Sequence, residues 1–243
     1  MAQGPLRAVF FDLDDTLTTY PGGFGAVLEA AYEVARQRGA REEDYAVFLR
    51  AFWSSTCGLW AAMHAGTITG DELRLIRLRR GLAAIGMDEE ALALQMHERW
   101  DREAVERPRL REGALELLHW LRGRVYLGLI TDGYRTKQRM KLERLGIASF
   151  FDSIQISEEA RTCKPFAATF QRALTAAGVA PEEAVMVGDN PNADIRGALG
   201  VGMRAIHLAP KGRDRTPDRA MWAADLGQVR EILSTLLRDG QSG

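Results

Sequence analysis

The strongest constraint on the fold of this 243-residue chain is a set of short apolar runs, most of which end in acidic or hydroxyl residues. They lie at residues 7–12, 125–131, 184–189 and 204–209. A continuous apolar run of this length indicates a strand buried on both faces, as in a parallel sheet. Helical patterns separate the runs, at 112–122, 134–145, 166–177 and 192–199, and glycines close the last three. This alternation predicts an α/β fold with a doubly wound, Rossmann-like parallel sheet.

Residues 24–107 have a different pattern, with helical periodicity and no convincing strand. Thr69 and Glu72 form a capping-box signature at the start of a helix that runs to about Ile85, and acidic residues 88–90 favour the start of another. Turn-forming residues mark both borders, at 19–23 and at Arg107-Pro108. We therefore expect an all-helical cap domain at residues 20–107, inserted into a core domain formed by residues 1–19 and 108–243.

Acidic residues gather where the predicted strands end. Asp12 and Asp14 follow the first run, Thr131 and Asp132 end the second, and Asp189 ends the third, with Asp194 shortly after it. In doubly wound sheets the ligand lies outside the carboxyl ends of the strands, so these side chains are expected at one rim. Clustered carboxylates repel each other unless a cation is present, and oxygen ligands without Cys or His favour Mg²⁺.

The order of these motifs resembles that of the haloacid dehalogenase (HAD) superfamily. In motif context the sequence is most similar to the N-acylneuraminate-9-phosphatase and pyrimidine 5′-nucleotidase-like subgroups. The resemblance rests on four segments: Asp12-Leu13-Asp14-Asp15-Thr16, Thr131-Asp132-Gly133, Lys164-Pro165, and Gly188-Asp189 followed by Asp194.

This resemblance implies a magnesium-dependent phosphatase that forms an aspartyl-phosphate. Asp12 is expected to be the nucleophile, and Asp14 the general acid that becomes the general base. Mg²⁺ is expected to be held by Asp12, by Asp14 through its backbone carbonyl, and by Asp189. Asp194 is expected to hold the metal or its waters from behind these ligands, and whether it binds the metal directly is left open.

Three further residues are expected to bind the phosphate: Thr131, Asp132 and Lys164. Members of the superfamily more often have Asn at the position of Asp132, and we expect its side chain to turn toward the amides of the following helix. Arg161 lies where the superfamily often has Gly. A different path is therefore expected for the loop to Lys164, with the amine still reaching the same place.

Composition narrows the class of partner. The formal net charge is −1 and the charges are interspersed, which gives no sign of nucleic-acid or membrane binding. The expected partner is a small phosphomonoester, either a sugar phosphate or a nucleotide monophosphate. Two cysteines and no export or anchoring signal lead us to expect a cytoplasmic protein. The oligomeric state is left open.

Three further activities on the same fold stay open: a 2-haloacid dehalogenase, a sugar phosphate mutase and a non-catalytic phosphate-binding module. Asp14 favours phosphate chemistry, because an alkoxide leaving group needs a proton and a halide does not. Lys137 and Lys141 are interpreted as a solvated helix face. A specificity pocket and a helical core both remain open interpretations of Trp53, Trp60, Met63 and His64.

Overall fold

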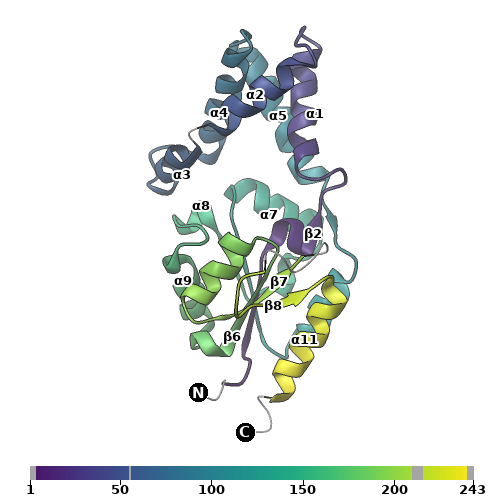
Figure 1. Cartoon of the computed structure of the whole chain (residues 1–243), viewed down its shortest axis with the longest axis vertical. Coiled ribbons are helices and arrows are strands. Elements are labelled where there is room, and N and C mark those ends of the chain that lie inside the picture. Colours follow the sequence, from purple (N-terminus) through teal and green to yellow (C-terminus); the bar gives the residue numbers. More distant parts are fainter. Residues whose placement is uncertain (1–3, 55, 210–215, 240–243) are drawn as a thin grey trace. The chain divides into compact units, whose positions relative to one another are not determined.

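The computed structural model describes residues 4–54, 56–209 and 216–239. The chain divides into two compact units, shown in Figure 1. The first comprises Met1–Thr19, Arg109–Asp132 and Leu145–Gly243, and the second comprises Tyr20–Pro108 and Gly133–Arg144. Residues 133–144, which the sequence analysis assigned to the core domain, group in the structure with the helical unit.

The first unit is built on a parallel sheet in the order β5-β4-β1-β6-β7-β8, which confirms the predicted fold class. The sequence analysis missed β5 and β8, which are edge strands with mostly half-buried side chains. The bounds are β1 (Ala8–Phe11), β4 (Tyr126–Thr131), β5 (Ser153–Ile156), β6 (Ala184–Gly188), β7 (Arg204–Leu208) and β8 (Met221–Ala223).

The path of the chain through this sheet creates a switch point beside β1. From β1 the chain passes to β4 and β5 on one side, and then returns to β6, β7 and β8 on the other. Connections that leave in opposite directions open a crevice at the carboxyl ends of the strands where they part. The ends of β1, β4 and β6 are therefore where a ligand site is expected.

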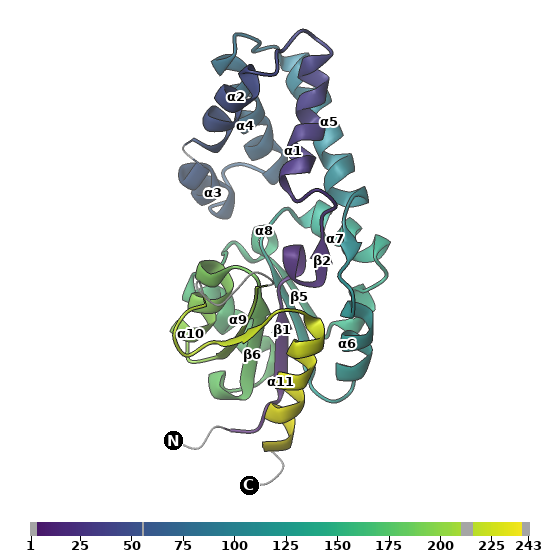
Figure 2. The ribbon, with the colours of Figure 1, turned by 45° about the vertical axis from the view of Figure 1, so that its right-hand side comes forward.

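Helices cover both faces of the sheet. Figure 2 shows α9 and α10 on one side of the strands and α6 and α11 on the other. On the first side Phe170 of α9 packs with Phe10 and Met186 of the sheet, all fully buried. The helices of this unit are α6 (Ala114–Leu121), α8 (Ser157–Ala160), α9 (Ala167–Ala177), α10 (Gly197–Gly200) and α11 (Leu226–Asp239).

Two short strands lie where the chain leaves and re-enters the first unit. The strands β2 (Thr18–Thr19) and β3 (Arg109–Leu110) pair in an antiparallel manner. They hold the two ends of the insertion side by side. Four short turns complete this unit: η1 (Leu13–Leu17), η2 (Ala148–Phe150), η3 (Pro181–Glu183) and η4 (Pro191–Arg196).

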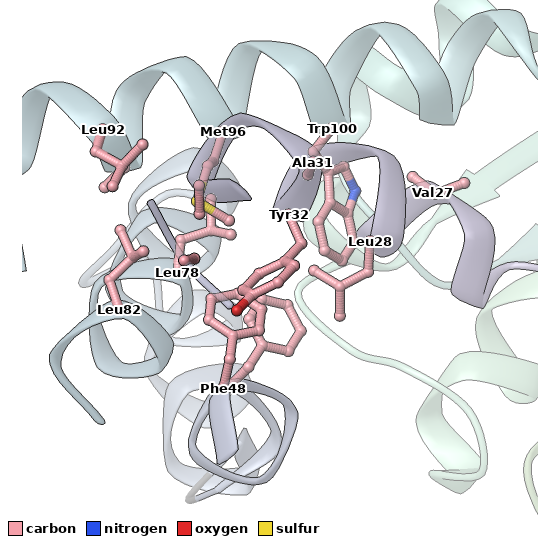
Figure 3. Packing of buried hydrophobic residues seen from close by; sticks show 14 of the residues in the cluster. Val27, Leu28, Ala31, Tyr32, Phe48, Leu78, Leu82, Leu92, Met96 and Trp100 are labelled. Atoms are coloured by element: carbon pink, nitrogen blue, oxygen red, sulfur yellow. The ribbon is translucent and has the colours of Figure 1, made fainter. Parts of the chain in front are cut away.

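The second unit contains only helices among its described residues. Its core, shown in Figure 3, is formed by Tyr32, Phe48, Leu78, Met96 and Trp100 together with smaller side chains. The predicted capping box is confirmed, because the Glu72 amide donates to Thr69 Oγ1 and the Thr69 amide donates to Glu72 Oε2. The bounds are α1 (Gly25–Arg36), α2 (Asp44–Trp53), α3 (Thr56–His64), α4 (Gly70–Ala84), α5 (Glu90–Glu106) and α7 (Arg135–Arg144).

One face of α7 is bound to the rest of the helical unit. Lys137 Nζ lies 2.5 Å from Asp101 Oδ2, and Lys141 Nζ donates to the Tyr20 hydroxyl over 2.8 Å. Residues spaced by three or four positions share a helix face, so both lysines lie on the face of α7 that contacts the other helical segments of this unit. Lys141 is only 3% exposed, and the interpretation of both lysines as a solvated face is therefore wrong.

None of the helices in the described part of the chain is long and apolar enough to cross a membrane.

Candidate active site

The first strand delivers Asp12 to the switch point. Asp12 follows β1 directly and is 5% exposed, and the chain then turns tightly through η1, where Asp15 adopts a left-handed φ of 61°. Arg111 holds this turn, because its guanidinium donates to the backbone carbonyls of Asp15 and Thr16. A turn fixed by a planar, always charged group keeps Asp12 and the half-buried Asp14 in a defined backbone geometry.

Two further carboxylates meet Asp12 from the other side of the switch point. Asp189 follows β6, Asp194 lies in η4, and carboxylate oxygens of all three residues lie within 4.8 Å of one another. Gly188 makes this approach possible, since a Cβ atom there would lie 2.4 Å from the carboxyl group of Asp194. Asn190 fixes Asp194, because its backbone N–H donates to Asp194 Oδ2 over 2.9 Å.

Lys164 is the cation of this cluster. Its Nζ lies 2.6 Å from Asp12 Oδ1 and 2.7 Å from Asp194 Oδ1, and all three side chains are almost completely buried. Burial disfavours the ammonium form, but the neighbouring carboxylates outweigh it and the pKa of Lys164 is raised well above its usual value. The structure places the amine of Lys164 at the acidic rim, between Asp12 and Asp194.

The remaining charge in the cluster is negative. Burial raises the pKa of Asp12 well above its usual value, against the lowering effect of Lys164. Burial, followed by repulsion from Asp194 and Asp15, raises the pKa of Asp189 to about 6. Lys164 alone therefore does not neutralise the carboxylates, and an additional cation would favour their ionised forms. Every available ligand atom in the cluster is oxygen, which fits Mg²⁺.

Two of the three predicted phosphate-binding residues, Thr131 and Asp132, lie at the end of the neighbouring strand β4. Thr131 ends β4, which pairs with β1, and is 1% exposed. The Asp132 carboxylate accepts the backbone amide of Lys164 over 3.2 Å. This amide belongs to the loop that carries Lys164.

Arg161 has an unusual backbone conformation in the segment that leads to Lys164. It ends α8 with φ 54° and ψ 31°, the left-handed conformation that glycine adopts with less strain. Arg161 therefore holds a backbone conformation typical of glycine three residues before Lys164.

The sequence analysis missed three residues that support the acidic rim. Arg111 contacts the turn after Asp12, Thr16 Oγ1 donates to Asp189 Oδ1 over 3.3 Å, and His207 Nε2 lies 3.0 Å from the Asp189 carbonyl. Thr16 was part of the first motif but was given no role, and His207 carried a signal because it lies near the carboxyl end of a predicted strand. In the helical unit Met63 is buried, Trp53 is half-exposed and Trp60 stacks on Tyr134.

The parallel sheet, its switch point and the acidic rim with a buried lysine define a hydrolase of the HAD type. The sequence matches the family described as haloacid dehalogenase-like hydrolase over residues 6–202, so the chain belongs to this family. This confirms the predicted family and the prediction of an enzyme.

Similar proteins cover nearly the whole chain. A phosphoserine phosphatase from Thermus thermophilus is 34% identical over 93% of this chain and 98% of its own length. A glyceraldehyde 3-phosphate phosphatase from Methanothermobacter thermautotrophicus is 34% identical over 94% of this chain and 100% of its own length. The crystal structure of a 2-haloacid dehalogenase from Pseudomonas syringae is 28% identical, with a TM-score of 0.70 over 95% of this chain and 99% of that one.

Proposed function

We propose that this hydrolase is a magnesium-dependent phosphatase that cleaves small phosphomonoesters through an aspartyl-phosphate at Asp12. The observation that carries the proposal is the convergence of the Asp12, Asp189 and Asp194 carboxylates at the switch point of the sheet. A site for a divalent cation beside a nucleophilic carboxylate and a buried ammonium suits a doubly charged phosphate group.

The names of the relatives support a phosphoric monoester hydrolase. The two relatives described above act on phosphoserine and on glyceraldehyde 3-phosphate, which are both small phosphomonoesters. Substrates of this size, together with sugar phosphates and nucleotide monophosphates, form the class that we propose for this chain. The helical unit is proposed to be the cap that sets the choice among them.

The metal ligands are proposed from the donor set. Asp12, Asp189 and the backbone carbonyl of Asp14 would hold Mg²⁺, with Asp194 supporting the site from behind. When bound, Mg²⁺ supplies positive charge that offsets the repulsion between the phosphate and the attacking carboxylate.

The chain's own residues then perform two displacements. A carboxylate oxygen of Asp12 attacks phosphorus and the bond to the leaving oxygen breaks, while Asp14 donates a proton to that oxygen. Asp14 then takes a proton from water, the water oxygen attacks phosphorus, and phosphate leaves as the carboxylate of Asp12 is restored. Lys164 Nζ lies 2.6 Å from Asp12 Oδ1 and favours the ionised form of this carboxylate, against the effect of burial.

The remaining residues hold the transferred group. Thr131 would donate its hydroxyl to the phosphate, and the backbone amide of Asp132 would do the same. The carboxylate of Asp132 accepts the backbone amide of Lys164. We therefore propose that Asp132 binds phosphate through its backbone and positions Lys164 through its carboxylate.

The test is phosphate release from phosphoserine, glyceraldehyde 3-phosphate, sugar phosphates, nucleoside monophosphates and an aryl phosphate. Each is measured with Mg²⁺ and with EDTA, for the wild type and for Asp12→Asn. We expect turnover of at least one substrate that needs Mg²⁺ and is lost in the variant. Equal, metal-independent release by both proteins would contradict the proposal.

The second candidate is a 2-haloacid dehalogenase, favoured by the 28% identical dehalogenase structure. Chloride release from 2-chloropropionate without added Mg²⁺ would support it. A sugar phosphate mutase would instead convert one sugar phosphate into its isomer without releasing phosphate. A non-catalytic module would bind inorganic phosphate with no turnover.

A further inference from the structure

A histidine that no step of the proposed mechanism uses lies directly behind the acidic rim. His207 is on β7, where it pairs in register with Gly188 of β6, the residue before Asp189. It is 2% exposed. The imidazole thus lies beside the carboxyl end of β6, which Asp189 follows. Each of its two ring nitrogens needs a hydrogen-bond partner, because the ring is buried.

Both ring nitrogens of His207 have partners. Nε2 lies 3.0 Å from the backbone carbonyl oxygen of Asp189, and Nδ1 lies 2.7 Å from Thr216 Oγ1. A carbonyl oxygen only accepts, so Nε2 must carry the proton and donate it. With a neutral ring, Nδ1 then accepts from the Thr216 hydroxyl, which gives a directed chain from Thr216 through His207 to Asp189.

His207 contacts the backbone of Asp189, and the conformation of this backbone sets the direction of the Asp189 carboxylate. The carbonyl of Asp189 belongs to the same residue whose carboxylate comes within 4.8 Å of Asp12 and Asp194. Thr16 holds one oxygen of that carboxylate, and His207 holds the peptide on its other side. Together the two contacts fix both ends of the residue.

We propose that His207 is a positioning residue for metal binding, an inference that rests on the metal site of the proposed function. Its Nε2–H anchors the Asp189 carbonyl, so that the Asp189 carboxylate is already oriented toward the metal before the cation arrives. Partners behind metal ligands generally change metal affinity by about 10- to 100-fold when they are removed.

Two conservative substitutions separate the two hydrogen bonds. In His207→Gln the side-chain amide nitrogen reaches the position of Nε2 and still donates to Asp189. In His207→Asn the amide reaches only the position of Nδ1, so the contact to Thr216 is kept and the contact to Asp189 is lost. An exposed histidine of the same unit, His119 on α6, provides the control His119→Asn.

The experiment measures Mn²⁺ binding to the metal-free protein. Binding is detected as the loss of the electron paramagnetic resonance signal of free Mn²⁺. We expect Mn²⁺ affinity within about threefold of wild type in His207→Gln, the scale of one modest hydrogen bond. In His207→Asn we expect a loss of about tenfold or more. Each titration is made at a temperature below the thermal unfolding midpoint of that variant, which is measured on the metal-free protein in EDTA.

The outcomes separate this inference from the proposed function. Wild-type affinity in His207→Asn, or a tenfold loss in folded His207→Gln, would overturn the positioning role and leave the metal site standing. A loss of affinity in His119→Asn equal to that in His207→Asn would overturn it as well. A wild-type protein that binds no Mn²⁺ would overturn both the inference and the metal-dependent function.

Discussion

Lys164 shows how a single residue can hold a repulsive site together. Its ammonium lies 2.6 Å from Asp12 and 2.7 Å from Asp194 in a region from which water is almost excluded. Removing one partner of a buried ion pair costs more than the pair itself is worth, because it leaves an unpaired charge behind. We therefore expect both the stability of this site and its proposed catalysis to depend on Lys164.

We expect Lys164→Met to lower the free energy of unfolding of the metal-free protein by about 3 kcal/mol, because two carboxylates lose their shared cation. Urea unfolding in EDTA measures this. Adding Asp12→Asn removes one of the unpaired charges, so the double variant should lose less than the sum of the two single variants. Strict additivity would show that Lys164 and Asp12 do not interact energetically.

His97 in the helical unit gives a pH-dependent term in stability. Burial, followed by repulsion from Arg74, lowers its pKa from 6.5 to about 4. Asp101 lies 3.6 Å from its Nε2, but this carboxylate is already paired with Arg74 and Lys137. Between about pH 6.5 and 4 the unfolded chain thus binds the proton more tightly, and stability is lost as pH falls through this window.

His97→Gln should remove this contribution. Its midpoint of thermal unfolding, followed by circular dichroism, is expected to fall less than that of the wild type as the pH is lowered through this window. Other groups titrate in the same range, so the difference between the two proteins is the relevant quantity. Parallel curves would contradict the assigned role of His97.

At the scale of elements, the sequence predicted the strands and helices that have a clear hydrophobic or capping pattern. The strands that lead to Asp12, Thr131 and Asp189 were predicted because each is a continuous apolar run, and the start of α4 was predicted from Thr69 and Glu72. The edge strands β5 and β8 were missed because half-buried strands lack that pattern. The grouping of α7 was missed because Lys141 and Tyr20 are 121 residues apart.

The packing of α2 against α4 gives a prediction at this scale. A Cβ atom on Gly81 would lie 2.4 Å from the fully buried ring of Phe48. Alanine is favoured over glycine within a helix by about 1 kcal/mol, but overpacking a core costs about 1–3 kcal/mol. We expect Gly81→Ala to lower the free energy of unfolding in urea by about 1 kcal/mol.

Gly58 on α3 provides the matched control, since a Cβ atom there would meet nothing within 4 Å. Gly58→Ala should therefore raise stability by a few tenths to about 1 kcal/mol through helix propensity alone. If both variants are stabilised, the contact between α2 and α4 does not restrict the size of residue 81.

At the scale of the whole molecule, the acidic rim belongs entirely to the α/β unit. Asp12, Asp132, Lys164, Asp189 and Asp194 come from four separate segments of that unit, which the parallel sheet brings together. The sequence motifs predicted which residues these are. The partners that hold them, such as the Lys164 amide for Asp132 and His207 for Asp189, depend on contacts that no local pattern encodes.

The most direct test of the account is to trap the phosphoryl group on the enzyme. Asp14→Asn should still be phosphorylated by an aryl phosphate with Mg²⁺, because this leaving group needs little protonation, but should hydrolyse the product slowly. Borohydride reduction after an acid quench, followed by peptide mass spectrometry, should then find homoserine at position 12. Phosphate release by the wild type with an unmodified Asp12 in the trapped variant would contradict the central claim.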